Sequence, residues 1–583
     1  MMNGRSGRYP NPSSSFRSVP SVPQAITWIK MSAGPGTGGA TSSQVKGVPN
    51  ARSRAAFMTR LRKHYGTDSG SSGWAVPVLA REPPAVNQVA YGGLSDWSIT
   101  GWSDTLRYLQ RVQHLGRDEK ERPVEWETIS QSGSEGAYRE GSPRSRDQFE
   151  RAIRSMPGGA KGAYFYPPYP LTIDRAEGCQ LYDVDGRCFI DFANHHTAQI
   201  LGHGHPAVLE AVRGQLSRGI AVGGPMGVEA ALAEELCRRI DSIDKIRFCN
   251  SGTEATLHAV RLARAFTDRP KIAKFEGGYH GSHDAVEISV APPVDRAGPA
   301  SAPRPVPSTG GMAPQAAAEV VVLPYDDEQA VERLLIQHRD ELACVLFDPK
   351  VGMYQTRPAF AQFLRRMTRQ HQMLLVFDEI VSFRVGRGGY QELCQVTPDL
   401  TTLGKIIGGG FPVGGVGGRS DIMDLFDNSG PPTGLGQSGT FSAHPVTMVA
   451  GLATLEQLDD AAFHQLNELG RHLRSGLEKC FQRVPQQAQI VGQGSLFSIY
   501  FAAGPLADYR SAAEADSTPV RDAVRHCLQR GLFLNHNLVM NALSLVTGEA
   551  EVERLIAAWS EILPPVARAD GALGVAAANR AGT

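Results

Sequence analysis

Two apolar stretches that end in charged residues constrain the fold of this chain more than any other feature. The stretch Leu374–Ile380 is a run of apolar residues that ends abruptly in two carboxylates, and Asp399–Gly410 is a short apolar run with one lysine, followed at once by glycines. Such runs are typical of buried strands whose carboxyl ends open into a site, where open α/β sheets bind ligands. The pattern therefore places Asp378 and Lys405 at the ligand-binding edge of a predicted sheet.

A lysine and a buried aspartate at such an edge suit one kind of cofactor. A desolvated lysine amine can form a Schiff base with an aldehyde, and a buried aspartate is costly unless something cationic meets it. Pyridoxal 5′-phosphate (PLP) needs both, an amine for its aldehyde and an anion for its ring nitrogen. Taken singly, Asp378 and Lys405 are better explained as an ordinary strand-end acid and an ordinary surface lysine, so the rest of the chain has to decide.

Composition excludes several classes of function. Lysine plus arginine equals aspartate plus glutamate, at 59 each, so no global charge argues for a nucleic-acid partner. No apolar run is long enough to span a membrane. The eight cysteines have no metal-ligand spacing, and His203 and His205 lack a third ligand, so no metal site is predicted. A disulfide framework is not expected in so large a chain, and we expect a reducing, cytoplasmic location.

Residues 1–145 differ in amino-acid composition from the rest of the chain. They are rich in serine, glycine, proline and arginine, and no acidic residue precedes Asp68. Three interpretations stay open: a disordered extension, a regulatory or partner-binding arm, and an organelle transit peptide, which would move the location to an organelle. Residues 567–583 are expected to form a flexible tail.

The middle of the chain alternates strand and helix patterns, which is typical of α/β proteins. A short strand, Ile246–Asn250, leads through Ser251, Gly252 and Thr253 into a helix. This arrangement predicts either an anion cradle at a helix N-terminus or plain helix capping. A Pro/Ala/Gly-rich stretch, 292–314, is expected to be a loop long enough to serve as a lid.

Seven short motifs, in this order along residues 150–565, resemble the class III (subgroup II) aminotransferases of PLP fold type I. The similarity is greatest to the branch with glutamate-1-semialdehyde aminomutase and β-amino-acid aminotransferases. The motifs are Leu181-Tyr-Asp-Val-Asp-Gly, Leu201-Gly-His-Gly-His-Pro, Asn250-Ser-Gly-Thr-Glu-Ala, Gly277-Gly-Tyr-His-Gly, Phe377-Asp-Glu-Ile, Thr397-Pro-Asp-Leu-Thr-Thr-Leu-Gly-Lys and Ser438-Gly-Thr-Phe.

The resemblance implies a fold and a domain plan. The fold is α/β, with a large domain built on a mostly parallel central sheet flanked by helices and a smaller α+β domain. Its expected parts are the disordered N-terminal extension 1–145, an N-terminal part of the small domain with an active-site segment at 146–220, the large PLP-binding domain 221–445, the C-terminal small domain 446–566 and the tail 567–583.

The resemblance also implies a role for each site residue. Lys405 is the Schiff-base lysine and proton shuttle, and Asp378 pairs with the pyridine nitrogen. Ser251, Gly252 and Thr253 are expected to bind the phosphate. Tyr279, Ile380 and His280 are expected to contact the ring. Thr440 is expected to contact the phosphate of the neighbouring subunit, in a homodimer with shared active sites.

Departures from the family pattern bear on the substrate. Where relatives carry a carboxylate-binding arginine, the nearest residue here is Lys161, a point charge without a bidentate fork. Leu538 and Val539 stand where relatives place a glutamate or an arginine, and Asp348 replaces a glutamate. We therefore expect ping-pong aminotransfer between an amino acid donor and a keto or aldehyde acceptor, with a β-amino or unusual biosynthetic substrate favoured. The alternatives are intramolecular transfer as in the aminomutase, a racemase or decarboxylase on the same scaffold, and a catalytically silent PLP-binding regulatory protein.

Overall fold

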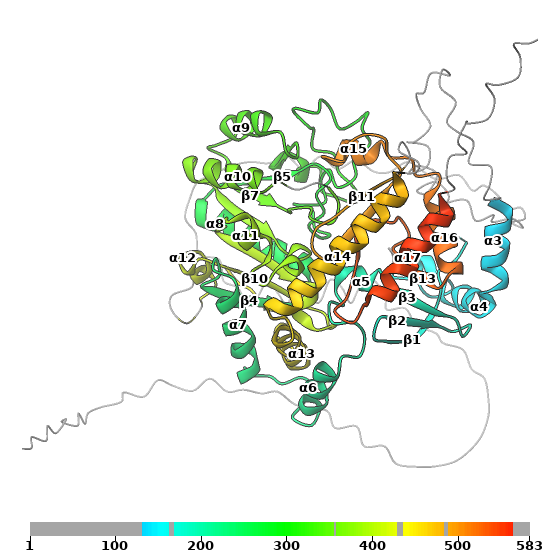
Figure 1. Cartoon of the computed structure of the whole chain (residues 1–583). Helices are drawn as coiled ribbons and strands as arrows, with labels where there is room; N and C mark the ends of the chain where they lie inside the picture. Colours follow the sequence, from blue (N-terminus) through cyan, green and yellow to red (C-terminus); the bar gives the residue numbers. More distant parts are fainter. Residues whose placement is uncertain are drawn as a thin grey trace, which may run out of the picture. The chain divides into compact units, whose positions relative to one another are not determined.

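The structure is a computed structural model, and it describes residues 131–161, 168–354, 357–427, 429, 435–482 and 488–563. Its largest element is a seven-stranded sheet, at the centre of Figure 1. The spatial order is β4 (Lys245–Cys249), β10 (Gly414–Gly418), β9 (Leu400–Gly404), β8 (Leu374–Asp378), β7 (Leu342–Phe347), β5 (Lys271–Phe275) and β6 (Val320–Leu323).

Five of these strands, β9, β8, β7, β5 and β6, run parallel to one another. Only β10 is antiparallel to its neighbours, β9 and β4. The predicted mostly parallel sheet is confirmed. Because the carboxyl ends of β7, β8 and β9 meet at one edge, the residues that follow them are brought together.

Helices cover both faces of this sheet, which explains why its strands are apolar throughout rather than alternating. Along β7, Cys344 and Leu346 face one apolar cluster and Val345 and Phe347 face the other. The first cluster includes α8 (Gly252–Thr267) and α12 (Ser420–Met423), and the second includes α9 (Glu328–Gln337), α10 (Pro358–Gln370) and α11 (Gly389–Cys394). The strand β7 is therefore buried along its whole length.

A third group of helices packs beside the β9–β10 end of the sheet. It consists of α6 (Pro206–Leu216), α7 (Gly227–Arg239) and α13 (Pro445–Glu456). The helix α13 contacts both of the others, and all three share an apolar cluster with Leu403 and Ile407. The helix α13 begins at the boundary expected between residues 445 and 446. A proline at its first position begins it.

The smaller part combines the two ends of the described chain. One sheet has the order β1 (Ile173–Glu177), β2 (Gln180–Asp183), β3 (Cys188–Asp191) and β13 (Leu532–Phe533), and another has β11 (Gln489–Val491), β12 (Leu496–Tyr500) and β14 (Asn541–Ala542). The strands β2 and β3 form an antiparallel hairpin around Asp185-Gly186. Four helices complete this part: α14 (Asp460–Phe481), α15 (Tyr509–Ala513), α16 (Val520–Gln529) and α17 (Glu549–Ile562).

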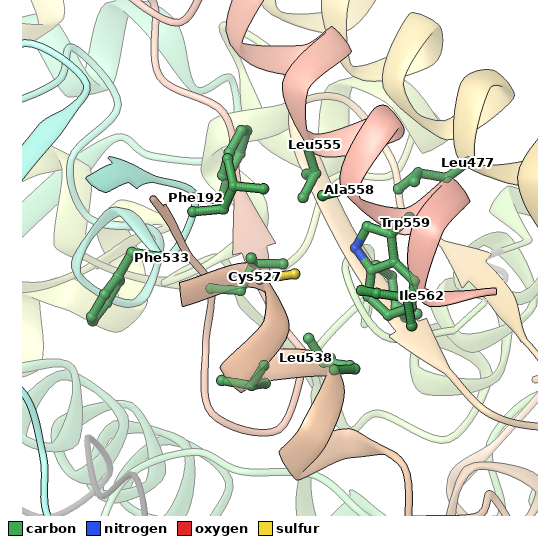
Figure 2. Close-up of a cluster of buried hydrophobic side chains, with 14 of the residues drawn as sticks. Phe192, Leu477, Cys527, Phe533, Leu538, Leu555, Ala558, Trp559 and Ile562 are labelled. Carbon is green, nitrogen blue, oxygen red and sulfur yellow. The ribbon is translucent and has the colours of Figure 1, made fainter. Parts of the chain in front are cut away.

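One buried cluster holds this smaller part together. Figure 2 shows the α17 side chains Leu555, Ala558, Trp559 and Ile562 near Leu477 of α14 and Phe192, which follows β3. Trp559 is fully buried and meets the ring of Phe481 at 5.6 Å between centroids. The apolar spacing along α17 therefore reflects packing against α14, beside which it lies in Figure 1.

The described structure begins with two helices, α3 (Gln131–Glu140) and α4 (Pro143–Ala152). Tyr138 is buried in the cluster of the smaller part, and Arg525 of α16 lies 3.0 Å from Glu135. The boundary of the disordered extension predicted at 145 is therefore wrong at its C-terminal end, because α3 gains a tertiary partner that its own weak apolar pattern does not reveal. The rest of that prediction, residues 1–130, lies outside the described residues, as does the predicted tail 567–583.

Short 3₁₀ segments link several of these elements. They are η1 (Pro157–Gly159), η2 (Ala316–Glu319), η3 (Ser382–Val385), η4 (Lys405–Gly408) and η5 (Asp424–Phe426). The predicted loop 292–314 contains neither a helix nor a named strand, and α15 holds both Pro292 at the start of the loop and Glu276, which precedes it. Tyr509 donates to the carbonyl of Pro292 at 2.8 Å, and Arg510 holds the buried Glu276 with two hydrogen bonds of 2.8 and 3.0 Å.

Candidate active site

The carboxylate of Asp378 lies at the end of β8 and is 5% exposed. Its Oδ2 is 2.7 Å from Nδ1 of His280, and its Oδ1 accepts hydrogen bonds from the hydroxyl of Thr402 and the N–H of Ile380, both at 3.2 Å. Within the described ranges, no lysine or arginine forms an ion pair with this carboxylate. Burial of an ionised carboxylate without a cation is costly, so the site is built to receive a positively charged group.

His280 is almost fully buried behind Asp378. Burial lowers the pKa of its imidazole, and the hydrogen bond with Asp378 opposes this shift. A neutral imidazole with its proton on Nδ1 is the tautomer that can donate to the Asp378 carboxylate, and we assign it on that ground. His280 therefore orients the carboxylate of Asp378.

Lys405 directly follows β9 and begins η4 with a φ of +50°. This left-handed conformation is uncommon for a residue other than glycine, and such strain concentrates at functional sites. Burial lowers the pKa of the Lys405 amine, while the nearby carboxylates of Asp378 and Asp348 oppose that shift. A lysine with a lowered pKa is a better nucleophile at neutral pH.

The N-terminus of α8 lies against Ile380, which follows β8. A Cβ added at Gly252 would be 2.6 Å from Cδ1 of Ile380, and one added at Gly414 of β10 would be 2.0 Å from the carbonyl oxygen of Ser251. Only glycine allows these close approaches. The hydroxyl of Ser251 accepts a hydrogen bond from the N–H of Glu254 at 3.2 Å, so the capping interpretation is correct. The N–H groups of the first turn, which have no partner within a helix, remain directed outward for an anion.

Two predicted ring contacts differ in exposure. The side chain of Ile380 is half-buried and contacts the backbone positions Gly252 and Gly404. Tyr279 is 55% exposed, and its hydroxyl lies 3.4 Å from the hydroxyl of Ser282. Ser282 N–H in turn donates to the Thr253 hydroxyl at 3.3 Å. Tyr279 is thereby linked to the N-terminus of α8 across one side of the site.

Thr440 is exposed, and so is its neighbour Phe441, at 59%. Among the described residues, no hydrogen bond or ion pair joins Thr440 to Lys405 or Asp378. An exposed phenylalanine beside it is typical of a surface that another chain covers.

The sequence also misses two histidines that lie beside the site. Asn194, His195, His196 and Thr197 form a left-handed turn, α5 (Asn194–Thr197), with φ values of 46, 51, 52 and 73°. Four successive residues with positive φ are costly, at about 1–2 kcal/mol each. The amine of Lys161 lies 3.5 Å from Nδ1 of His195. Burial, followed by the charges of His195 and Lys405, lowers the pKa of His196 to about 4.

Three side chains hold this turn in place. Asp191 accepts hydrogen bonds at 2.9 Å from the N–H groups of Ala193 and Asn194, and Asn194 donates to the carbonyl of Ala542. The fully buried Arg384 donates to the carbonyl of Thr197 at 2.7 Å. The turn is therefore fixed from β3, η3 and β14. No sequence pattern indicates four successive left-handed residues, which is why His195 and His196 were not predicted.

Other sequence assignments lie away from the site. Leu538 is fully buried in the cluster of Figure 2, and Val539 packs against a separate cluster with Tyr500. Leu538 therefore has a packing role. His203 pairs with Asp191 at 2.8 Å. Among the residues that the structure describes, no group of three metal-ligating side chains is present, and no helix is long and apolar enough to cross a membrane.

The residues at this edge fit the chemistry of PLP. The desolvated lysine amine suits the aldehyde of PLP, and the buried carboxylate that lacks a cation suits the ring nitrogen. The N-terminus of a long helix suits the phosphate. The close approach of Ile380 to Gly252 leaves an apolar side chain beside the phosphate cradle, where a flat ring can lie.

Comparison with known proteins agrees with this fit. The model of the family described as aminotransferase class-III matches residues 163–563. The glutamate-1-semialdehyde 2,1-aminomutase of Methanocaldococcus jannaschii is 36% identical over 396 residues, which cover 67% of this chain and 91% of that protein. The family match extends over the seven-stranded sheet and the smaller part alike.

Two solved structures are similar in both fold and sequence. An omega-transaminase from Sphaerobacter thermophilus has a TM-score of 0.70 and 44% identity, and the match covers 73% of this chain and 98% of that chain. A β-phenylalanine aminotransferase from Variovorax paradoxus has a TM-score of 0.67 and 35% identity, over 74% and 96% of the two chains. The chain therefore belongs to the class-III aminotransferases, the PLP-dependent enzymes that move an amino group between small molecules.

Proposed function

We propose that the residues at the carboxyl edge of β8 and β9 bind PLP and perform the aminotransfer. The observation that carries this proposal is the pair of Asp378 and Lys405, a buried carboxylate without a cation and a desolvated amine at neighbouring strand ends. The further proposed contacts are Ser251, Gly252 and Thr253 with the phosphate, Tyr279 and Ile380 with the two ring faces, and His280 beside the ring.

In this proposal the chain's own groups have distinct tasks. Bound PLP supplies an aldehyde for the substrate amine and a ring that accepts an electron pair. The Lys405 amine takes the proton from the substrate carbon that carries the amino group, acting as general base, and later returns a proton as general acid. Asp378, oriented by His280, keeps a positive charge on the ring nitrogen. The donor's product leaves before the acceptor enters, which gives ping-pong kinetics.

Lys161 and His195 support a proposal about the substrate. The amine of Lys161 lies 3.5 Å from Nδ1 of His195 in the held turn α5, and the charges of both Lys405 and Lys161 act on the next residue of that turn, His196. A carboxylate of the donor is the group that an ammonium and an imidazole donor recognise. Together with the similarity to a β-phenylalanine aminotransferase, this pair of side chains favours a β-amino acid as the donor.

An assay of donors and acceptors tests this function. We expect β-amino and α-amino acids to be converted in the presence of pyruvate or 2-oxoglutarate, with the β-amino donors faster. The second candidate is intramolecular aminotransfer, supported by the 36% identical aminomutase. Intramolecular transfer requires no second substrate. If the protein converts glutamate-1-semialdehyde without an acceptor and turns over no donor–acceptor pair, intramolecular transfer takes the place of the proposed function.

Replacement of Lys161 by methionine should weaken binding of the donor. We expect KM for a carboxylate-bearing donor to rise about tenfold or more, because a hydrogen bond to a charged group contributes about 1.5–3 kcal/mol, while kcat changes little. Steady-state kinetics of K161M measures this. The matched control is K479M, which removes an exposed lysine of α14. An unchanged KM in K161M would exclude Lys161 from the substrate site.

We also propose a homodimer in which Thr440 completes the site of the partner subunit. Thr440 and Phe441 are both exposed in the single chain. We expect sedimentation to show a dimer and T440A to weaken PLP binding about tenfold, since one hydrogen bond to a charged group is lost. A monomer that binds PLP as tightly as the dimer would contradict this arrangement.

A cytoplasmic location is a further part of the proposal. All eight cysteines belong to the described residues, and all are free thiols. Free thiols persist in a reducing compartment. Fractionation of cells that express the full chain would test this location.

A further inference from the structure

A second carboxylate lies next to Asp378 at the same edge of the sheet. The parallel strands β7 and β8 are paired so that Phe347 is opposite Phe377. The residues that follow these two phenylalanines, Asp348 and Asp378, are therefore neighbours at the strand ends. The charge of Asp348 acts on both Lys405 and His280, raising the pKa of each against the larger effect of burial. Lys405 is thus within reach of two carboxylates.

Lys350 is folded back onto the carboxylate of Asp348. Its Nζ lies 2.8 Å from Oδ2 of Asp348, and its backbone N–H donates to Oδ1 at 3.0 Å. Its side chain is only 3% exposed. To reach this position Lys350 adopts a φ of +58°, and the carbonyl of Pro349 accepts a hydrogen bond from the hydroxyl of Tyr325 at 2.7 Å. A buried lysine in a left-handed conformation is doubly unfavourable, so its placement calls for a reason.

The charged groups around this pair are few. Lys274 of β5 is fully buried, with its Nζ donating to the carbonyl of Gly278 at 2.8 Å, and burial, helped by Lys350, lowers its pKa to about 7. His280 and Asp378 form the pair described above, and Tyr325 and Tyr354 are buried phenols with raised pKa values. Burial raises the pKa of Asp348, but Lys350 and then His280 outweigh this effect, so its pKa lies below the ordinary value. Lys350 is the group in direct contact with Asp348.

We propose that Lys350 holds the Asp348 carboxylate at the strand end and takes up part of its charge, so that the Lys405 amine faces one full carboxylate charge, that of Asp378, rather than two. Lys350 is then a positioning residue that keeps the Lys405 amine readier to lose its proton than it would be beside two uncompensated carboxylates. This inference rests on the proposed role of Lys405, and it concerns a residue outside the contacts proposed for PLP.

A double-mutant cycle on the PLP-loaded protein tests the inference. The readouts are the pH midpoint at which the visible absorbance of the bound cofactor changes and the pH midpoint of the rate at which apoprotein takes up PLP. In K350M the uncompensated Asp348 charge should raise both midpoints by about one pH unit, a tenfold change in the unprotonated fraction at a fixed pH below the midpoint. D348N should lower both midpoints, and K350M/D348N should return them close to the wild-type values.

The controls separate charge from packing. K350R retains the cation and should leave both midpoints close to wild type, whereas a role confined to filling space predicts equal effects of K350R and K350M. K271M removes a lysine that is paired with Glu341 at 2.9 Å on the surface, and it should change nothing. Unchanged midpoints in K350M, or shifts of the same sign in K350M and D348N, would overturn the inference.

Failure of this inference can be told apart from failure of the proposed function. If K405A keeps the visible absorbance, the proposed function is wrong and the midpoints do not report on Lys405. If K405A loses it and K350M leaves the midpoints unchanged, the inference alone is wrong. Should K350M fail to fold, D348N and K350M/D348N decide the question, because a midpoint that D348N lowers and the double variant restores supports the inference, whereas equal midpoints in these two variants overturn it.

Discussion

Replacement of Lys405 by alanine should abolish aminotransfer and the visible absorbance of the bound cofactor together. The proposed role makes one amine both the covalent partner of the cofactor and the group that moves the proton. General acid–base catalysis alone contributes about 10²–10⁴-fold, so we expect kcat to fall by about 10⁴-fold or more. Alanine at this left-handed position bears a strain similar to that of lysine, so the fold should be retained.

Absorbance spectra, steady-state kinetics and thermal unfolding of K405A measure these effects side by side. K271M is the matched control, since Lys271 forms its ion pair away from the site, on the side chain of Glu341. The result that would refute the assignment is transamination by K405A at the wild-type rate. A loss of activity together with a loss of the cooperative unfolding transition would instead show that the substitution acts on folding.

Replacement of Asp378 by asparagine should leave the cofactor bound but slow the reaction by about 10²–10³-fold, the loss typical when one charge-stabilising group is removed from a transition state. Asparagine keeps the size of aspartate and can still accept the hydrogen bond from His280 Nδ1, which lies 2.7 Å from the native carboxylate. It cannot balance a positive charge on the ring nitrogen. The expected outcome is a large decrease in kcat with a modest change in PLP affinity.

Single-turnover kinetics of D378N with a saturating donor measures the chemical step directly. The control is D399N, because Asp399 is another buried aspartate, paired with Arg365 and Arg419, each at 2.9 Å. We expect D399N to lower the free energy of unfolding and to leave the kcat of the folded protein near wild type. A D378N protein as fast as wild type would show that the ring nitrogen needs no carboxylate here.

Strand ends were predictable from the sequence because their signal is local. The apolar runs before Asp378 and Lys405 are typical of buried strands, and the structure has them as β8 and β9. Parallel neighbours then bring their ends together, so Asp378 and Lys405 share an edge. The Ser251–Thr253 turn was found in the same way, from a strand followed by a helix start.

Features that depend on long-range contacts were not predictable. The glycine-rich segment Gly414–Gly418 forms β10 inside the sheet, although glycine is unfavourable in strands. Glycine is required at position 414 because the carbonyl of Ser251 leaves no room for a side chain there. The turn around His195 depends on Arg384 and on the carbonyl of Ala542, both distant in the sequence. Lys350 carries no sequence signal, since a lysine after Asp-Pro normally faces solvent.

The cluster drawn in Figure 2 also determines when each part of the chain can fold during its synthesis. All seven strands of the large sheet lie between Lys245 and Gly418, so this sheet can pair before the ribosome has made the last helices. Tyr138, Phe189 and Phe192, by contrast, are made early and must wait for α14, α16 and Trp559 to bury them. The nascent chain therefore exposes an apolar N-terminal surface until translation is nearly complete, which makes this surface the natural point of contact for a chaperone.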